Sequence, residues 1–268
     1  MNKTLVNTVK RSELANTLAL HDFSNIIYDL KGWINFTVDL FRDYGLEPTC
    51  MGITAPSIKS GKMNTYIREV KKLEKLDVST IMGISIKATI NGSASFHNDQ
   101  ILTAIFNVGL KSEITSCVVT LDNSLASFEP DRWNDIAEHM AAFFNPRYGY
   151  GYQRAYEKGP EWYPFGVSTK YRDAEGEQIC CWKNAYIMQN GKYRAGDMRD
   201  IYPLNILSFS HNQRMVGGIT LFDWINADAN RGTLTRLGEK LWSWWISNEQ
   251  IDLVRAALKP TGILLCAP

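Results

Sequence analysis

The chain has 268 residues, of which 45% are hydrophobic and 21% charged, a composition typical of a globular protein with a sizeable core. Its 29 basic and 28 acidic residues nearly cancel, so a net charge of +1 gives no overall field for nucleic acid or an anionic membrane. The sequence predicts neither a signal peptide nor a membrane span, because charged residues interrupt Met1–Phe23 and no apolar run is long enough. The cysteines are typical of reduced core thiols, which favours a cytoplasmic protein.

The first third of the chain predicts two helices and a strand between them. Residues 31–46 have apolar side chains at helical spacing, and Gly45 and Pro48 follow the last turn. Met51–Ala55 predicts a short strand. A second helix is predicted after the Pro56–Gly61 loop, with one apolar face made of Tyr66, Ile67, Val70 and Leu73.

Two strands are predicted in the middle of the chain. Apolar and polar residues alternate over Ile84–Ile90 and lead into Asn91-Gly92, a pair typical of a hairpin turn. Ile114–Leu121 predicts a further strand. A helix then begins at Pro130 and ends before Pro146, and an extended aromatic and glycine segment follows at 148–152.

The C-terminal end repeats this order. Leu241–Ile246 predicts an aromatic strand, and Ser247 with Gln250 forms a capping box for the next helix. Lys259-Pro260 ends that helix, and Gly262–Cys266 predicts a closing strand.

Together these elements predict an α+β fold with antiparallel or mixed sheets and helices packed on one face. Strand, helix, proline and strand occur in that order at 114–152 and again at 241–266. An architecture of two ferredoxin-like halves is therefore an alternative interpretation. No linker rich in Pro, Gly or Ser separates them. We therefore expect a single compact domain over 1–268, with pseudo-repeated halves at about 1–165 and 166–268 as the alternative.

No catalytic or cofactor motif emerges, so the sequence predicts a protein that is not an enzyme and binds no cofactor or metal. The four histidines lack the spacing of a helical zinc site, and His139 is expected to be a partly buried structural residue. Ser60-Gly61-Lys62-Met63 lacks the glycine-rich nest of a phosphate loop. Four carboxylates could hold a magnesium ion or perform acid/base chemistry, although solvated loops explain them better: Asp197, Asp200, Asp223 and Asp228.

Aromatic residues concentrate in the second half of the chain. Nine of twelve tyrosines and six of eight tryptophans follow residue 147. The segment Arg147–Tyr152 is similar to a base-stacking strand, so a nucleic-acid-binding module using Tyr148, Tyr150 and Tyr152 beside Arg147 and Arg154 is one interpretation. A half-buried strand is the favoured interpretation and a protein-binding surface the next. The rings of Trp242, Trp244 and Trp245 cannot all share one face of a strand.

Several segments of the second half resemble bacterial immunity proteins, which protect a cell from polymorphic toxins or toxins secreted by the type VI system. The resemblance covers residues 145–266 and is nearest to immunity proteins paired with restriction-endonuclease-like DNase toxins. It rests on these segments: Met198–Ser208, Gly218–Ile225, Gly232–Leu234, Leu241-Trp242 and Ile251–Arg255. Residues 1–110 add little to it. The resemblance implies a non-catalytic α+β protein that binds a cognate toxin, of the nuclease class, and occludes its active site.

A toxin-binding site can be proposed from the same region. A nuclease cleft is basic, so an acidic and aromatic loop at Glu157–Phe165 could enter it. The residues expected to contact the toxin are Tyr148, Tyr150, Tyr152, Glu161, Trp162, Tyr163, Asp197, Asp200, Asp223 and Asp228. The alternative is that Trp162 and Tyr163 close over the core.

Overall fold

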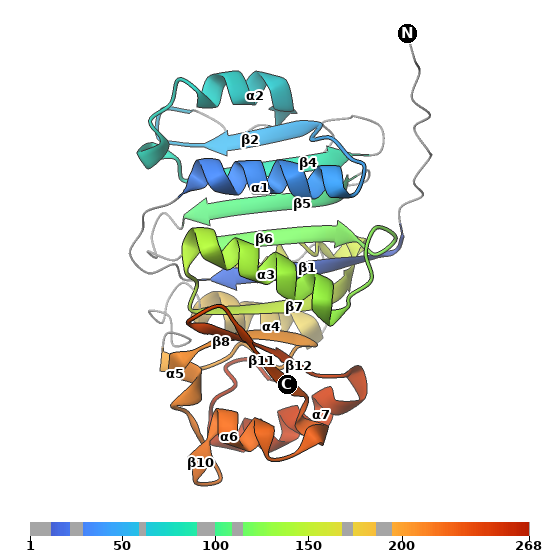
Figure 1. Ribbon diagram of the computed structural model, residues 1–268, viewed down its shortest axis with the longest axis vertical. Helices are drawn as coiled ribbons and strands as arrows, with labels where there is room; N and C mark the ends of the chain where they lie inside the picture. The colour runs from blue at the N-terminus through green and yellow to red at the C-terminus, as the bar shows by residue number, and fades with distance from the viewer. Residues whose placement is uncertain are drawn as a thin grey trace.

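Ten strands form one antiparallel sheet in this computed structural model, which describes residues 12–21, 29–58, 63–89, 100–108, 115–167, 174–185 and 195–267. The strand order is β11-β12-β8-β7-β1-β6-β5-β4-β2-β3, and a small hairpin of β9 and β10 stands apart from this sheet (Figure 1). The strands are β1 (Leu14–His21), β2 (Cys50–Thr54), β3 (Asn64–Thr65), β4 (Gly83–Thr89), β5 (Gln100–Val108), β6 (Thr115–Asp122), β7 (Tyr148–Ala155), β8 (Leu204–Ser208), β9 (Met215–Val216), β10 (Ile219–Thr220), β11 (Thr233–Leu237) and β12 (Leu241–Trp245). The predicted α+β class is confirmed.

Helices cover both faces of the sheet, whereas the sequence predicted helices on one face. The helices are α1 (Leu30–Asp43), α2 (Tyr66–Leu73), α3 (Pro130–Phe144), α4 (Ala174–Lys183), α5 (Phe209–Asn212), α6 (Leu221–Asn226) and α7 (Asn248–Leu258). Residues of α1 and α3 share one buried cluster with Leu18 and Leu20, while α4, α6 and α7 share a second cluster with Ala19 (Figure 1). Successive residues of β1 therefore point into different cores, as alternation along a strand requires.

Two local predictions differ from the structure. The sequence predicts Ile67 on the apolar face of α2, but the structure leaves Ile67 70% exposed. Tyr66, Val70 and Leu73 share the buried side of the helix, and Ile67 lies about 100° around the axis from Tyr66. The predicted closing strand at 262–266 does not join the sheet. It makes an isolated parallel bridge to residues 198–199, with the Leu265 amide donating to the Met198 carbonyl at 2.8 Å. The predicted turn at Asn91-Gly92 lies outside the described residues.

The alternation of tyrosine and glycine in β7 follows from unequal space on the two faces of the sheet. A Cβ atom on Gly151 would lie 2.8 Å from Cζ of Phe128, and one on Gly149 would lie 2.7 Å from the Ala19 carbonyl oxygen. Both glycines face the tightly packed side, while the tyrosines between them fill the other core. The boundary considered between two pseudo-repeated halves, near residue 165, falls between β7 and β8, which are neighbours in this sheet.

Across the described part of the chain, no helix has both the length and the apolar character needed to cross a membrane.

Candidate protein-binding surface

The tyrosines of β7 belong to the core rather than to the surface. Tyr148, Tyr150 and Tyr152 are all buried, and their hydroxyl groups are used inside the protein. The Tyr148 hydroxyl accepts from the Arg199 backbone amide at 2.8 Å, and the Tyr152 hydroxyl donates to the Pro160 carbonyl at 2.6 Å. A base-stacking platform needs exposed rings, so this arrangement gives no support to the nucleic-acid interpretation.

A buried arginine organises these rings. Arg199 donates from Nη1 to the Tyr150 hydroxyl at 2.8 Å and to the Tyr163 carbonyl at 3.0 Å, and its guanidinium carbon lies 3.7 Å from the centre of the Tyr163 ring. Burial raises the pKa of Tyr148 and Tyr202 well above the usual value, so these phenols stay neutral around the cation. The cluster therefore acts as a polar part of the core.

The loop at 157–165 closes over this cluster, as the alternative prediction stated. Glu161 and Tyr163 are buried, and the Tyr163 hydroxyl lies 3.1 Å from that of Tyr202. Trp162 is half-buried against Phe165, with their ring centres 6.2 Å apart. The loop therefore offers Trp162 but not the Glu161 carboxylate to a partner.

The four aspartates do not form one acidic patch. Asp197 and Asp200 are buried and paired with Arg214 and Arg255, at 3.0 and 2.8 Å. Asp228 instead caps a short helical segment by accepting the Asn230 backbone amide, and the Asp223 carboxylate accepts the hydroxyl of Thr220, the residue that caps α6. Within the described residues, no group of three or more His, Cys, Asp or Glu side chains could hold a metal ion. Of the ten predicted contact residues, substantial exposed surface remains on three: Trp162, Asp223 and Asp228.

Exposed apolar side chains lie elsewhere, on α5 and the β9–β10 hairpin. Among eight exposed large hydrophobic residues in the described parts of the chain, three fall within eleven positions: Phe209 (60% exposed), Met215 (56%) and Ile219 (42%). We call these three residues the hairpin surface. Gly217 and Gly218 form its turn with φ of +59° and +91°, the positive values that a tight two-residue hairpin requires. The hairpin lies at the end of the molecule opposite α2 (Figure 1).

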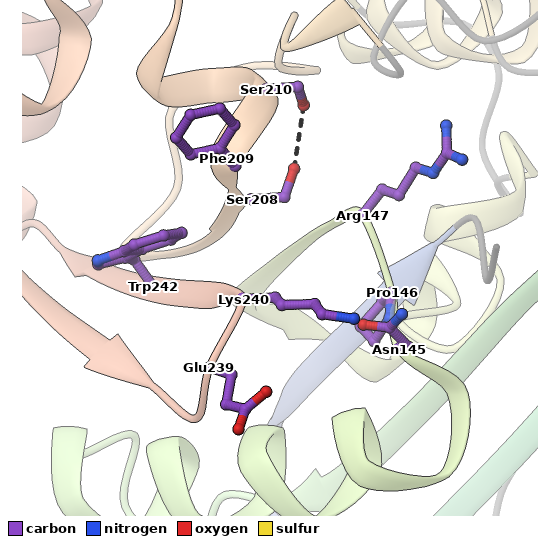
Figure 2. Close-up of a pocket in the computed structure, with 9 residues that line it drawn as sticks. All are labelled: Asn145, Pro146, Arg147, Ser208, Phe209, Ser210, Glu239, Lys240 and Trp242. Atoms are coloured by element: carbon purple, nitrogen blue, oxygen red, sulfur yellow. Dashed lines mark hydrogen bonds between the residues drawn. The ribbon is translucent and has the colours of Figure 1, made fainter.

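A pocket of about 510 Å³ adjoins Phe209 (Figure 2). Three segments distant in sequence line it: Asn145–Arg147 after α3, Ser208–Ser210 at the start of α5, and the β11–β12 turn with Trp242. Asn145 ends α3 in the left-handed conformation at φ +47°, and the chain leaves the helix there to form the first of these segments. Figure 2 shows the rings of Phe209 and Trp242 on one side of the pocket and the side chain of Arg147 on the other.

The charges around the pocket define the partner that it would suit. Arg147 and Lys240 are exposed at its rim, together with one acidic residue, Glu239. Aromatic walls and an excess of positive charge suit an apolar side chain flanked by carboxylates. These features are typical of a protein-binding surface, with aromatic and arginine residues as anchors.

A serine and a histidine also meet at this pocket, but their geometry does not form a catalytic dyad. The Ser208 hydroxyl lies 3.2 Å from Nδ1 of His211. The same Nδ1 accepts the Ser208 backbone N–H at 3.1 Å, so its lone pair is already used in a helix capping box. Burial lowers the pKa of His211 to about 3, which makes it too weak a base to activate a hydroxyl near neutral pH.

Buried histidines predict that the protein is unstable in acid. Burial, with a smaller contribution from Arg199 for His21, lowers the pKa of both His21 and His211 to about 3 from an ordinary value of 6.5. Between about pH 6.5 and 3 these two imidazoles are protonated in the unfolded chain but stay neutral in the folded chain. The free energy of unfolding therefore falls as the pH drops toward 3. We expect a loss of ~2 kcal/mol per histidine between pH 7.5 and 5, measurable by urea denaturation.

His211→Gln is the matched variant for this prediction. A glutamine at this position can still accept the Ser208 amide in a capping box but carries no titrating group. It should remove about half of the pH dependence. A pH dependence equal to that of the wild type would show that His211 does not contribute.

His139, expected to be partly buried, is instead exposed and stacked on Phe36, with ring centres 5.8 Å apart.

Sequence reasoning did not identify Phe209, Met215 or Ile219 as candidate contact residues. The available signal was Val216-Gly217-Gly218-Ile219, a glycine pair between apolar residues that predicts a tight hairpin. Sequence alone could not show that the side chains next to this turn are exposed, because burial depends on how α5 and α6 pack.

Comparison with known proteins identifies the fold but not the family. No protein-family model matches the sequence, and no curated protein matches it. Among solved structures, the chain is similar to the Pseudomonas aeruginosa T6SS protein PA0821, where T6SS denotes the type VI secretion system. The TM-score is 0.59 at 13% sequence identity, over 94% of this chain and 73% of that protein. At this identity the likeness establishes a shared fold.

Proposed function

We propose that this protein is an immunity protein that binds a toxin delivered by a type VI secretion system and neutralises it by occluding its active site. The hairpin surface carries the proposal, because Phe209 lines the pocket, and the exposed Met215 and Ile219 of the hairpin after α5 add apolar side chains that a protein partner could contact. The fold shared with a T6SS protein supports the same setting. We propose a nuclease as the toxin on the resemblance over residues 145–266, and the cytoplasm as the place of action.

Strict stoichiometric inhibition distinguishes this proposal from an enzymatic role. A neutralising complex of this kind buries on the order of 1,600 Å² and reaches nanomolar affinity. The contact would centre on the hairpin surface and extend over the rim at Arg147 and Lys240, which would meet carboxylates that the toxin carries outside its basic phosphate-binding groups.

Co-expression provides the test. The gene next to that of this protein is expected to encode the toxin, and its product should arrest growth of a host cell when expressed alone. Growth should recover when this protein is made in equal or greater amount, and the two proteins should elute together on a sizing column. Arrested growth with no complex on the column would contradict the proposal.

A further inference from the structure

Two cysteine thiols from distant parts of the chain meet beside the C-terminal segment. Cys181 lies in α4, and Cys266 follows α7 by eight residues. The thiol of Cys266 donates a hydrogen bond to the sulfur of Cys181, with the two sulfur atoms 2.8 Å apart across 85 positions of sequence. Both cysteines are free thiols.

The surrounding backbone holds both sulfur atoms in place. Cys181 donates from its thiol to the Leu265 carbonyl at 3.1 Å, which fixes the end of α4 against the C-terminal segment. That segment is itself fixed, because the Cys266 amide donates to the Arg199 carbonyl at 2.8 Å. The two thiols therefore approach each other in the folded chain without any rearrangement of its elements.

The two thiols differ in access to solvent. Cys181 is half-buried, whereas Cys266 is buried. Burial raises the pKa of Cys266, so it remains a protonated thiol at neutral pH. A small oxidant would therefore reach Cys181 first, and Cys266 is positioned as the resolving thiol.

We propose that Cys181 and Cys266 form an intramolecular disulfide when the protein meets a peroxide, so that the pair is a redox-sensitive clamp between α4 and the C-terminal segment. In the first step the Cys181 thiolate attacks hydrogen peroxide, which gives the sulfenic acid and hydroxide. In the second step the Cys266 sulfur displaces the sulfenic hydroxyl, so that the S–S bond forms and water leaves. The proton that the Cys181 thiol releases on ionisation converts the hydroxide to water, so two thiols are oxidised and one peroxide is reduced to two molecules of water.

The clamp changes both the thiol count and the stability of the protein. Of the five thiols in the sequence, two should be lost with one equivalent of peroxide, leaving three. Closing a loop of this length restricts the unfolded chain, so the melting temperature should rise on the order of 10 °C. A reducing agent such as dithiothreitol should reverse both changes.

Three serine variants of the full chain make the test specific. Free thiols are counted after denaturation, with and without peroxide, and non-reducing gels report cross-links between chains. Cys180→Ser removes the exposed neighbour and should still lose two thiols and gain stability. Cys181→Ser and Cys266→Ser should each lose no thiol pair and show no rise in melting temperature.

Three results would overturn the proposal. The wild type could keep all five thiols at one equivalent of peroxide. Cys180→Ser could block the reaction, which would assign the bond to Cys180. A disulfide between two chains could account for the lost thiols, which the gels would reveal as a dimer. Because no toxin takes part, the outcome is independent of the proposed immunity function.

Discussion

Replacing Phe209 by aspartate should abolish protection against the toxin and weaken the complex at least ~100-fold, which corresponds to ~3 kcal/mol. The physical reason is that a charge would be buried in the apolar centre of the contact without a partner. Folding stability should change little, because Phe209 is 60% exposed. Affinity is measured by calorimetry with the purified toxin, and stability by urea denaturation.

Ile67→Asp is the matched control for this substitution. Ile67 is 70% exposed on α2, at the opposite end of the molecule from the hairpin (Figure 1). Ile67→Asp introduces the same charge on an apolar residue that is also mostly exposed, and it should leave toxin binding unchanged. Met215→Asp should reproduce the effect of Phe209→Asp. An equal loss of toxin affinity in the hairpin and α2 variants would indicate a general effect of charge and would contradict the hairpin surface as the binding site.

Arg199→Ala should destabilise the fold by ~4 kcal/mol, the largest effect on stability that we expect from one side chain. The variant leaves the Tyr163 carbonyl without its buried donor, removes the cation from the Tyr163 ring, and opens a cavity under the covering loop. Urea denaturation at pH 7.5 measures the loss. A change below ~1 kcal/mol would show that the cluster tolerates loss of the cation.

Arg199→Met separates the volume of this side chain from its charge. Within the described residues no carboxylate forms an ion pair with Arg199, so the guanidinium is desolvated against tyrosine oxygens and rings alone. Methionine keeps much of the volume and avoids the cost of burying a charge. Arg199→Met should therefore lower the free energy of unfolding by less than half as much as Arg199→Ala. Equal losses of stability in the two variants would show that the volume of the side chain is not what matters.

Local sequence patterns predicted four helices, α1, α2, α3 and α7, and five strands, β2, β4, β6, β7 and β12, because their signals are short-range. Helical spacing and flanking prolines located α1 and α3 to within a few residues, and the Ser247 and Gln250 capping box marked the start of α7. The tyrosine and glycine alternation correctly predicted β7. Its buried rings match the interpretation favoured from sequence, a strand packed against a hydrophobic layer.

The arrangement of elements could not be predicted because it depends on long-range pairing. β1 lies between β6 and β7 in the centre of the sheet, and its own residues do not specify which strands pair with it. The same limit applies to the site. Glu161 and Asp200 look like surface carboxylates in the sequence, yet the structure buries both, and only tertiary packing reveals that Phe209 is exposed.

Hydrogen–deuterium exchange on the complex with the toxin tests the central claim most directly, because it locates the contact without any mutation. The account predicts slower exchange of backbone amides at 209–220 and 239–242 when the toxin is bound, with no change over α2. A stable complex that leaves exchange at 209–220 and 239–242 unaltered would contradict the hairpin surface as the binding site.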